Sequence, residues 1–156
     1  MRGFFIMIVS ATKNDVQDLT QIALISKAYW GYTEEQIQSW TEDLTVTHKM
    51  IEEMMVFKFI SNNKIVGFYI LNQPKNSTIE LEFLFVHPDS IGQKIGKQLL
   101  THAIEKAILL NAKAMTLLAD PNAQAFYESH GFISTGKKES SIPNRFLPIM
   151  KKDLIK

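Results

Sequence analysis

The chain of 156 residues contains no cysteine. Disulfide bonds, thiolate catalysis and cysteine-based zinc sites are therefore excluded, and a reducing compartment is permitted. No apolar run approaches the length of a membrane span, so we expect no membrane partner. The apolar start, residues 4–9, is interpreted as a first strand, because no convincing cleavage site for a secretory leader follows it. Together these absences favour a cytoplasmic protein.

An excess of charge of either sign is also missing. The chain has 17 lysines and arginines against 16 aspartates and glutamates, which gives a formal net charge of +1. Nucleic-acid-binding domains normally show a basic excess or a basic stripe, so we expect no nucleic-acid partner. The four histidines show no metal-ligand spacing, and no metal is expected.

The rest of the composition is that of a globular protein. Hydrophobic residues make up 46% and charged residues 21% of the chain. The length is typical of one domain and long enough to bury a core, so residues 1–156 are predicted to form a single domain. The composition leaves a homodimer open.

Apolar spacing predicts elements in the order β-α-α-β-β-β-α-β-α-β-β. Thr12 or Asn14 can cap a first helix that ends near Gly31, and Thr33 with Gln36 forms a capping box for a second. The fold class is therefore α/β, with a mixed sheet flanked by helices. The predicted strands are 4–9, 55–61, 64–71, 78–86, 112–119, one from 132 and 145–151. A single helical turn is expected at 47–53, and the later helices are 92–110 and 122–130.

Residues 78–100 combine a strand, a glycine-containing turn and the start of a helix. The first N–H groups of a helix have no internal partner, and the helix dipole is positive there. Gly92 and Gly96 lack a Cβ atom, which lets a diphosphate approach the main chain. This stretch therefore favours a site for a phosphorylated ligand, with a purely structural turn as the alternative.

Two segments resemble motifs of the GNAT superfamily of N-acetyltransferases. The first is VHPDSIGQKIGKQLL, residues 86–100, and the second is DPNAQAFYESHGF, residues 120–132. The second is the more specific, since it fixes several residue identities at set spacing. The resemblance covers nearly the whole chain and is typical of small bacterial members. It implies a single-domain fold with a central, mostly antiparallel sheet flanked by helices.

The resemblance implies acetyl-CoA as co-substrate, because the amide groups of the family's turn bind its pyrophosphate. Aligned on Gly96, Ile91 stands where the family usually has Gln or Arg, and Lys94 where it usually has Gly. Asp120 replaces the Asn that binds the pantetheine arm, and Asn122 could supply that amide; local capping is the alternative for both. The implied cofactor-binding residues are Leu84, Phe85, Val86, Ile91, Gly92, Gln93, Lys94, Ile95, Gly96, Lys97, Asp120 and Asn122.

Tyr127 is the candidate general acid. A thiolate leaves coenzyme A during acetyl transfer and needs a proton, which a phenol within hydrogen-bond reach can donate. The resemblance implies a place for Tyr127 beside the sulfur, while simple packing, as expected for Phe126, is the alternative.

Glu80 and Glu82 are the candidate bases. Lying two apart on a predicted strand, they point to one face, while Leu81 and Phe83 point to the other. The family often uses a Glu on this strand to deprotonate the amine, and counting back from Gly96 favours Glu80 over Glu82. A solvated strand face is the alternative. A main-chain N–H near residues 84–86 is the implied oxyanion donor.

The acceptor pocket of the family lies by the first two helices, so Trp30 and Tyr32 are candidate substrate-binding residues, with core packing as the alternative. The predicted function is acetyl-CoA-dependent transfer of an acetyl group to a primary amine of a small molecule or a protein. A non-catalytic acyl-CoA-binding or regulatory module on the same fold is the alternative. An RNA-modifying acetyltransferase toxin is disfavoured, because the balanced charge predicts no basic face.

Overall fold

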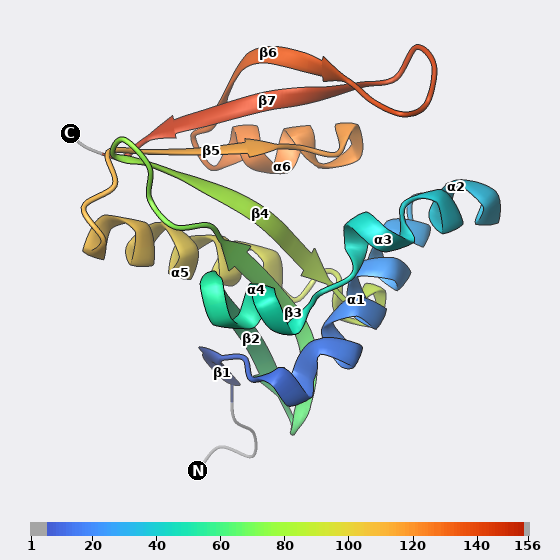
Figure 1. The fold of residues 1–156 in the computed structure, drawn as a ribbon, viewed down its shortest axis with the longest axis horizontal. Helices are drawn as coiled ribbons and strands as arrows, with labels where there is room; N and C mark the ends of the chain where they lie inside the picture. Colours follow the sequence, from blue (N-terminus) through green and yellow to red (C-terminus); the bar gives the residue numbers. More distant parts are fainter. Residues whose placement is uncertain (1–5, 155–156) are drawn as a thin grey trace.

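A computed structural model describes residues 6–154, and its central feature is one seven-stranded sheet in the order β1-β2-β3-β4-β5-β7-β6 (Figure 1). Residues 4–5 of the predicted first strand lie outside the described residues. The strands are β1 (Ile6–Ser10), β2 (Met55–Ser61), β3 (Lys64–Leu71), β4 (Thr78–Val86), β5 (Ala114–Leu118), β6 (Ile133–Glu139) and β7 (Phe146–Asp153), and the helices are α1 (Val16–Ala28), α2 (Glu34–Ser39), α3 (Thr41–Leu44), α4 (His48–Glu53), α5 (Ile95–Leu109) and α6 (Gln124–Ser129).

All neighbouring strands are antiparallel except β4 and β5, which run parallel. The predicted mixed α/β fold with a mostly antiparallel sheet is therefore confirmed. The parallel pair is short: residues 78–80 of β4 pair with residues 114–116 of β5. Beyond that point the two strands diverge, and a wedge-shaped opening separates the two parts of the sheet (Figure 1).

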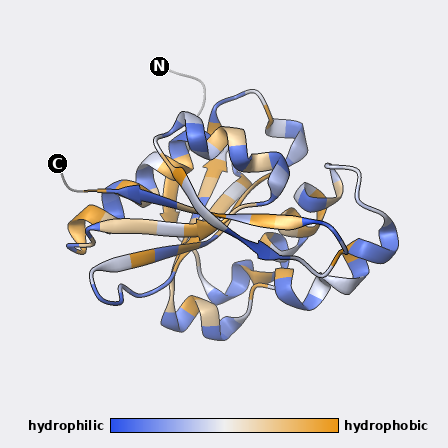
Figure 2. Ribbon diagram, turned by 90° about the horizontal axis from the view of Figure 1, so that it is seen from above, coloured by the Kyte–Doolittle hydropathy of each residue, from blue (hydrophilic) through white to orange (hydrophobic). Residues whose placement is uncertain are grey.

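Two apolar clusters cover the two faces of the sheet. One face packs against α5 and α6, with Leu99, Ala103 and Tyr127 in its cluster. The other packs against α1, through Leu19, Ile22 and Ala23. Figure 2 shows hydrophobic residues concentrated along the central strands. Burial on both faces explains why the strands carry long apolar runs.

A β-bulge in β4 changes which face its side chains reach. Ile70 of β3 pairs with Phe83, but the next residue, Leu71, pairs with Leu81, so Glu82 has no partner in the register. Leu81 consequently joins the cluster under α5, and Phe83 the cluster under α1. The prediction that Leu81 and Phe83 share a face is therefore wrong, because an extra residue in one strand breaks the two-residue alternation.

Two helices begin later than their apolar spacing predicts. The helix expected at 92–110 is α5, Ile95–Leu109, because Gly92 and Lys94 have φ of 92° and 62°, which a helix cannot accommodate. The helix expected at 122–130 starts as a 3₁₀ turn, Pro121–Ala123, which α6 continues. No helix among residues 6–154 has both the length and the apolar character needed to cross a membrane.

Candidate functional site

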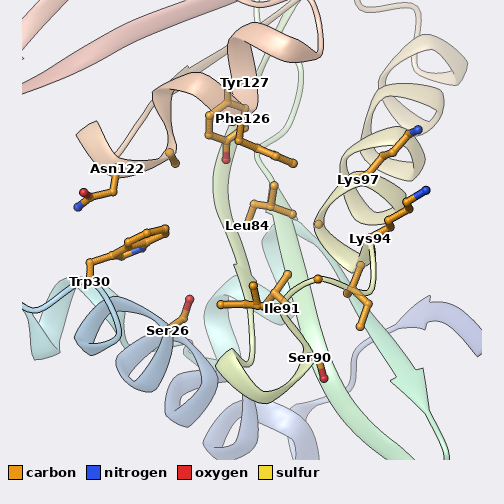
Figure 3. A pocket seen from close by; sticks show the side chains of 15 residues that line it. Ser26, Trp30, Leu84, Ser90, Ile91, Lys94, Lys97, Asn122, Phe126 and Tyr127 are labelled. Carbon is orange, nitrogen blue, oxygen red and sulfur yellow. The ribbon is translucent and has the colours of Figure 1, made fainter.

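A cavity of about 420 Å³ lies at the opening between β4 and the α6 segment. Figure 3 shows the side chains of α1, β4, the turn before α5, and α6 converging on it. The predicted site residues that line it are Trp30, Leu84, Val86, Ile91, Gly92, Lys94, Ile95, Gly96, Lys97, Asn122 and Tyr127. Four further lining residues were not predicted to belong to the site: Ser26, Ser90, Ala123 and Phe126, although the last two belong to the second motif.

The turn before α5 presents main-chain groups to the cavity. The first α-helical bond runs from the Gln98 N–H to the Lys94 carbonyl, at 3.1 Å, so the preceding amides have no carbonyl four residues back. Gly92 carries a positive φ that suits glycine, and Lys94 adopts the left-handed region despite its side chain. The Lys94 and Lys97 side chains extend away from Trp30, on the far side of the turn (Figure 3). This end of the cavity can hold an anion.

The edge of β4 forms the adjoining wall. Leu84 and Val86 line the cavity, and beyond residue 80 β4 has a partner strand on its β3 side alone. Main-chain groups on the other edge are therefore free to bind a ligand. Phe85 packs instead against the cluster under α1, and neither Phe85 nor Gln93 lines the cavity.

Tyr127 provides a hydroxyl on the opposite wall. Its side chain is 7% exposed, and the hydroxyl points into the cavity toward Leu84 (Figure 3). Edge-on contacts hold the ring, with centroids 5.1 Å from Phe126 and 5.6 Å from Phe132. Burial raises the pKa of Tyr127, so the phenol keeps its proton at neutral pH. A protonated hydroxyl that points into the cavity can donate its proton to a ligand that binds there.

Glu80 and Glu82 lie outside this cavity. Glu80 lines a separate hollow with the turn between β3 and β4, and Glu82 accepts a hydrogen bond from Asn72 Nδ2 at 3.1 Å. Partial burial, together with the hydrogen bond and negative charge of Glu82, raises the pKa of Glu80 to about 6, which Lys138 partly opposes. Such a carboxylate is ionised near neutral pH and binds a proton readily. The described residues contain no group of three His, Asp or Glu side chains suited to a metal ion.

Trp30 lines the cavity at 44% exposure, whereas Tyr32 does not line it. The Tyr32 hydroxyl lies 3.0 Å from the nearer carboxylate oxygen of Asp120. The same carboxylate binds Lys27 Nζ at 2.6 Å and Arg145 Nη2 at 3.1 Å. Lys27 and Arg145 carried no signal in the sequence, because they lie far from Asp120 along the chain and belong to no motif. Asp120 itself is turned toward these groups and does not line the cavity.

A family model described as an acetyltransferase (GNAT) domain matches residues 30–154 of the chain. Among curated proteins, the chain is similar to two proteins named uncharacterized N-acetyltransferase ycf52. The one from Pyropia yezoensis is 28% identical over 79 residues, and the one from Gracilaria tenuistipitata var. liui is 30% identical over 79 residues. These matches cover 51% and 49% of the chain, and 45% and 43% of the relatives, so the chain spans less than half the length of the curated relatives it matches.

Several solved structures share the fold. The PaiA N-acetyltransferase from Thermoplasma acidophilum, solved in complex with coenzyme A, has a TM-score of 0.80 at 22% identity, over 96% of this chain and 99% of that one. The ribosomal-protein-S18-alanine N-acetyltransferase from Escherichia coli has a TM-score of 0.75 at 22% identity, over 96% of this chain and 94% of that one. At this level of identity the likeness shows the arrangement of elements.

Proposed function

Because the chain belongs to the GNAT family of acetyltransferases, we propose that it transfers the acetyl group of acetyl-CoA to a primary amine of a small molecule or a protein. One observation carries the proposal. The α5 N-terminus, the unpaired edge of β4 and the Tyr127 hydroxyl all meet at a single cavity. They provide an anion site, a set of main-chain hydrogen-bond donors and an acid. Transfer of an acetyl group from the thioester of coenzyme A to an amine requires all three.

The position of the anion site at one end of the cavity suggests one orientation for bound acetyl-CoA. Its diphosphate would sit on the amides of Gly92 and residues 94–97, where the helix dipole and the absence of a Cβ at Gly92 favour close approach of an anion. Lys94 and Lys97 would add positive charge on the outer side. The pantetheine arm would then run along the β4 edge past Leu84, and bring the thioester toward Tyr127.

The chemistry follows from that placement. A neutral amine attacks the thioester carbonyl, and a main-chain N–H of residues 84–86 donates to the developing oxyanion. When the tetrahedral intermediate collapses, the C–S bond breaks and the Tyr127 hydroxyl donates its proton to the departing thiolate. The phenolate regains a proton from solvent, and the products are the acetylated amine and coenzyme A.

Glu80 is the proposed acceptor of the amine's proton. Because Glu80 lies in a separate hollow, four residues along β4 from Leu84, the proton would pass through a chain of water molecules. The raised pKa of Glu80 suits this role, since the carboxylate is ionised at neutral pH yet more basic than an ordinary glutamate. Glu82, its hydrogen-bonded neighbour, is the second candidate for the base.

The first test is ligand binding. The purified protein should bind coenzyme A and acetyl-CoA, and the free energy of unfolding should rise by RT ln(1 + [L]/Kd), or about 2.7 kcal/mol at a hundredfold excess over Kd. Adenosine, which lacks the diphosphate, is the matched control and should shift the melting temperature little. No shift at millimolar coenzyme A contradicts the proposal.

The second test is turnover. A broad panel of amines should include one that releases free coenzyme A from acetyl-CoA, read with a thiol reagent. The absence of cysteine makes this assay clean, because the protein contributes no thiol of its own. Binding without release by any amine would favour the non-catalytic acyl-CoA-binding module.

A further inference from the structure

Side chains from both parts of the sheet join at the open end of the wedge between β4 and β5. We call this set the Asp120 cluster, and it consists of Lys27, Tyr32, Asp120, Asn122 and Arg145. Lys27 and Tyr32 belong to the N-terminal part, which packs on β1–β4. Asp120, Asn122 and Arg145 belong to the C-terminal part, around β5–β7. At the closed end, backbone pairing of β4 with β5 covers just residues 78–80 and 114–116.

Asp120 is the centre of the cluster. One of its oxygens accepts from Lys27 Nζ at 2.6 Å and from Arg145 Nη2 at 3.1 Å. The other accepts from the main-chain N–H and the Nδ2 group of Asn122, both at 2.9 Å. Tyr32 completes the set, because its hydroxyl lies within reach of the carboxylate and accepts from Arg145 Nη2 at 2.6 Å. Together these five donors fill the hydrogen-bond-accepting capacity of the Asp120 carboxylate.

Burial makes these bonds strong. The side chains of Lys27, Asp120 and Arg145 are 16%, 11% and 15% exposed. Burial alone would raise the pKa of Asp120, but the hydrogen bond and charge of Lys27, with the donors of Asn122 and Tyr32, hold that pKa below its usual value. The Asp120 carboxylate is therefore ionised at neutral pH, and its attraction to the buried donors is weakly screened by salt.

A second link crosses the same opening. Trp40 packs edge-on against Tyr32, with ring centroids 4.9 Å apart. Its Nε1–H donates to Ser141 Oγ, in the loop between β6 and β7, at 2.9 Å. Lys27 and Arg145 each lie 5.3 Å from the Trp40 ring, at the distance of a cation–π contact.

The cluster is also connected to the cavity. Asn122 is a lining residue and a member of the cluster. Ser26 and Trp30, which line the opposite side, flank Lys27 on α1 and its extension. We propose that the Asp120 cluster is an ionic brace that fixes the width of the cavity and so positions Asn122 and Trp30 toward the ligands. Its members act as positioning residues; the kinetic part of this inference rests on the proposed function.

Distance measurement tests the brace without any assumption about catalysis. The cysteine-free chain accepts two spin labels, at Gln38→Cys on α2 and Ala125→Cys on α6, both exposed and without a side-chain hydrogen bond among the described residues. Pulsed electron paramagnetic resonance should give one narrow distance distribution. Asp120→Asn, which keeps the shape and removes the charge, should broaden that distribution and lengthen its mean.

Asp15→Asn is the matched control. Asp15 accepts from Lys58 Nζ at 2.8 Å, and the side chains of Lys58 and Asp15 are 16% and 13% exposed, nearly as in the Lys27–Asp120 pair. That pair joins the start of α1 to β2 and does not cross the opening. Asp15→Asn should lower the melting temperature but leave the label distances unchanged. An unchanged distribution in Asp120→Asn, or equal broadening in Asp15→Asn, overturns the brace.

Kinetics provides the second readout. Asp120→Asn should raise KM for acetyl-CoA or for the acceptor by roughly tenfold and change kcat less, because misplaced walls weaken binding while Tyr127 keeps its hydroxyl. Tyr32→Phe removes one bridging hydroxyl and should give a smaller shift in the same direction; it also serves if Asp120→Asn fails to fold. A fall in kcat alone, with KM and label distances unchanged, contradicts a positioning role.

Discussion

The two walls of the cavity offer a ligand different kinds of groups. The wall formed by β4 and the start of α5 offers main-chain amides, and the wall formed by α6 and Asn122, the one member of the Asp120 cluster that lines the cavity, offers side chains. A main-chain donor survives most substitutions, because every residue except proline supplies it. The first wall can therefore carry Ile91 and Lys94, whereas the second depends on the identity of each residue.

Tyr127→Phe, on the side-chain wall, should have the largest effect on turnover. The change keeps the ring contacts with Phe126 and Phe132 and deletes the acid, so kcat should fall by about 10²-fold or more, while affinity for coenzyme A stays nearly intact. Steady-state kinetics and a binding titration measure the two quantities.

Tyr69→Phe is the matched control for that variant. Tyr69 is fully buried in the same apolar cluster, and its hydroxyl lies 2.7 Å from His102 Nδ1. Loss of this hydroxyl should lower stability but leave kcat unchanged. If Tyr127→Phe retains normal turnover, water protonates the thiolate and the tyrosine serves packing alone.

Glu80→Gln should have the next largest effect, about a tenfold to a hundredfold loss of kcat at neutral pH. The base acts in its ionised form, so wild-type kcat/KM should rise as pH increases through about 6, the raised pKa of Glu80 in the free protein. Glu80→Gln should abolish that rise and recover part of the rate at high pH, where the amine is already neutral. A pH profile of kcat/KM with one good acceptor measures both.

Glu82→Gln separates the two carboxylates. The hydrogen bond and charge of Glu82 help to raise the pKa of Glu80, so their removal should move the rise in kcat/KM toward lower pH without abolishing it. If Glu82→Gln abolishes the rise and Glu80→Gln does not, Glu82 is the base. If both variants keep the wild-type profile, the amine arrives deprotonated from solvent.

The difference between the walls also explains which features were predictable from sequence. Strands and helices follow from apolar periodicity, and the order of elements from β2 to β7 was confirmed. Between β1 and β2 the structure has four helices, α1 to α4, where two helices and a single turn were expected. The start of α5 was placed three residues early, because apolar spacing continues through Gly92 while the backbone there has a positive φ. The bulge at Glu82 was missed, since pairing with β3 decides it and local spacing does not.

Side-chain clusters from several segments are the least predictable part. The motifs located both walls of the cavity, but Lys27 lies 93 residues and Arg145 25 residues from Asp120. Sequence spacing carries no signal for contacts between such distant segments; tertiary packing creates them. A single domain over residues 1–156, a homodimer and a cytoplasmic location stay predictions.

The smallest expected effect lies on the main-chain wall, at Lys94. This residue holds a φ of 62°, where a side chain costs about 1 kcal/mol relative to glycine. Lys94→Gly removes that cost, which stabilises the folded state. Glycine also raises the conformational entropy of the unfolded chain, which destabilises the folded state by a similar amount, so the free energy of unfolding should change by less than about 1 kcal/mol. Lys94→Met keeps the backbone cost and removes the charge alone, which makes it the matched partner.

Both variants should weaken coenzyme A binding by only about threefold, with a shallower dependence of Kd on salt, because an exposed ammonium contributes little beside the α5 amides. Isothermal titration at two salt concentrations measures this. A hundredfold loss in both variants would make the Lys94 charge the main phosphate ligand, and the first wall would then depend on side chains as the second does. A loss in Lys94→Gly alone would mean that glycine at this position loosens the turn, and that the lysine holds its shape.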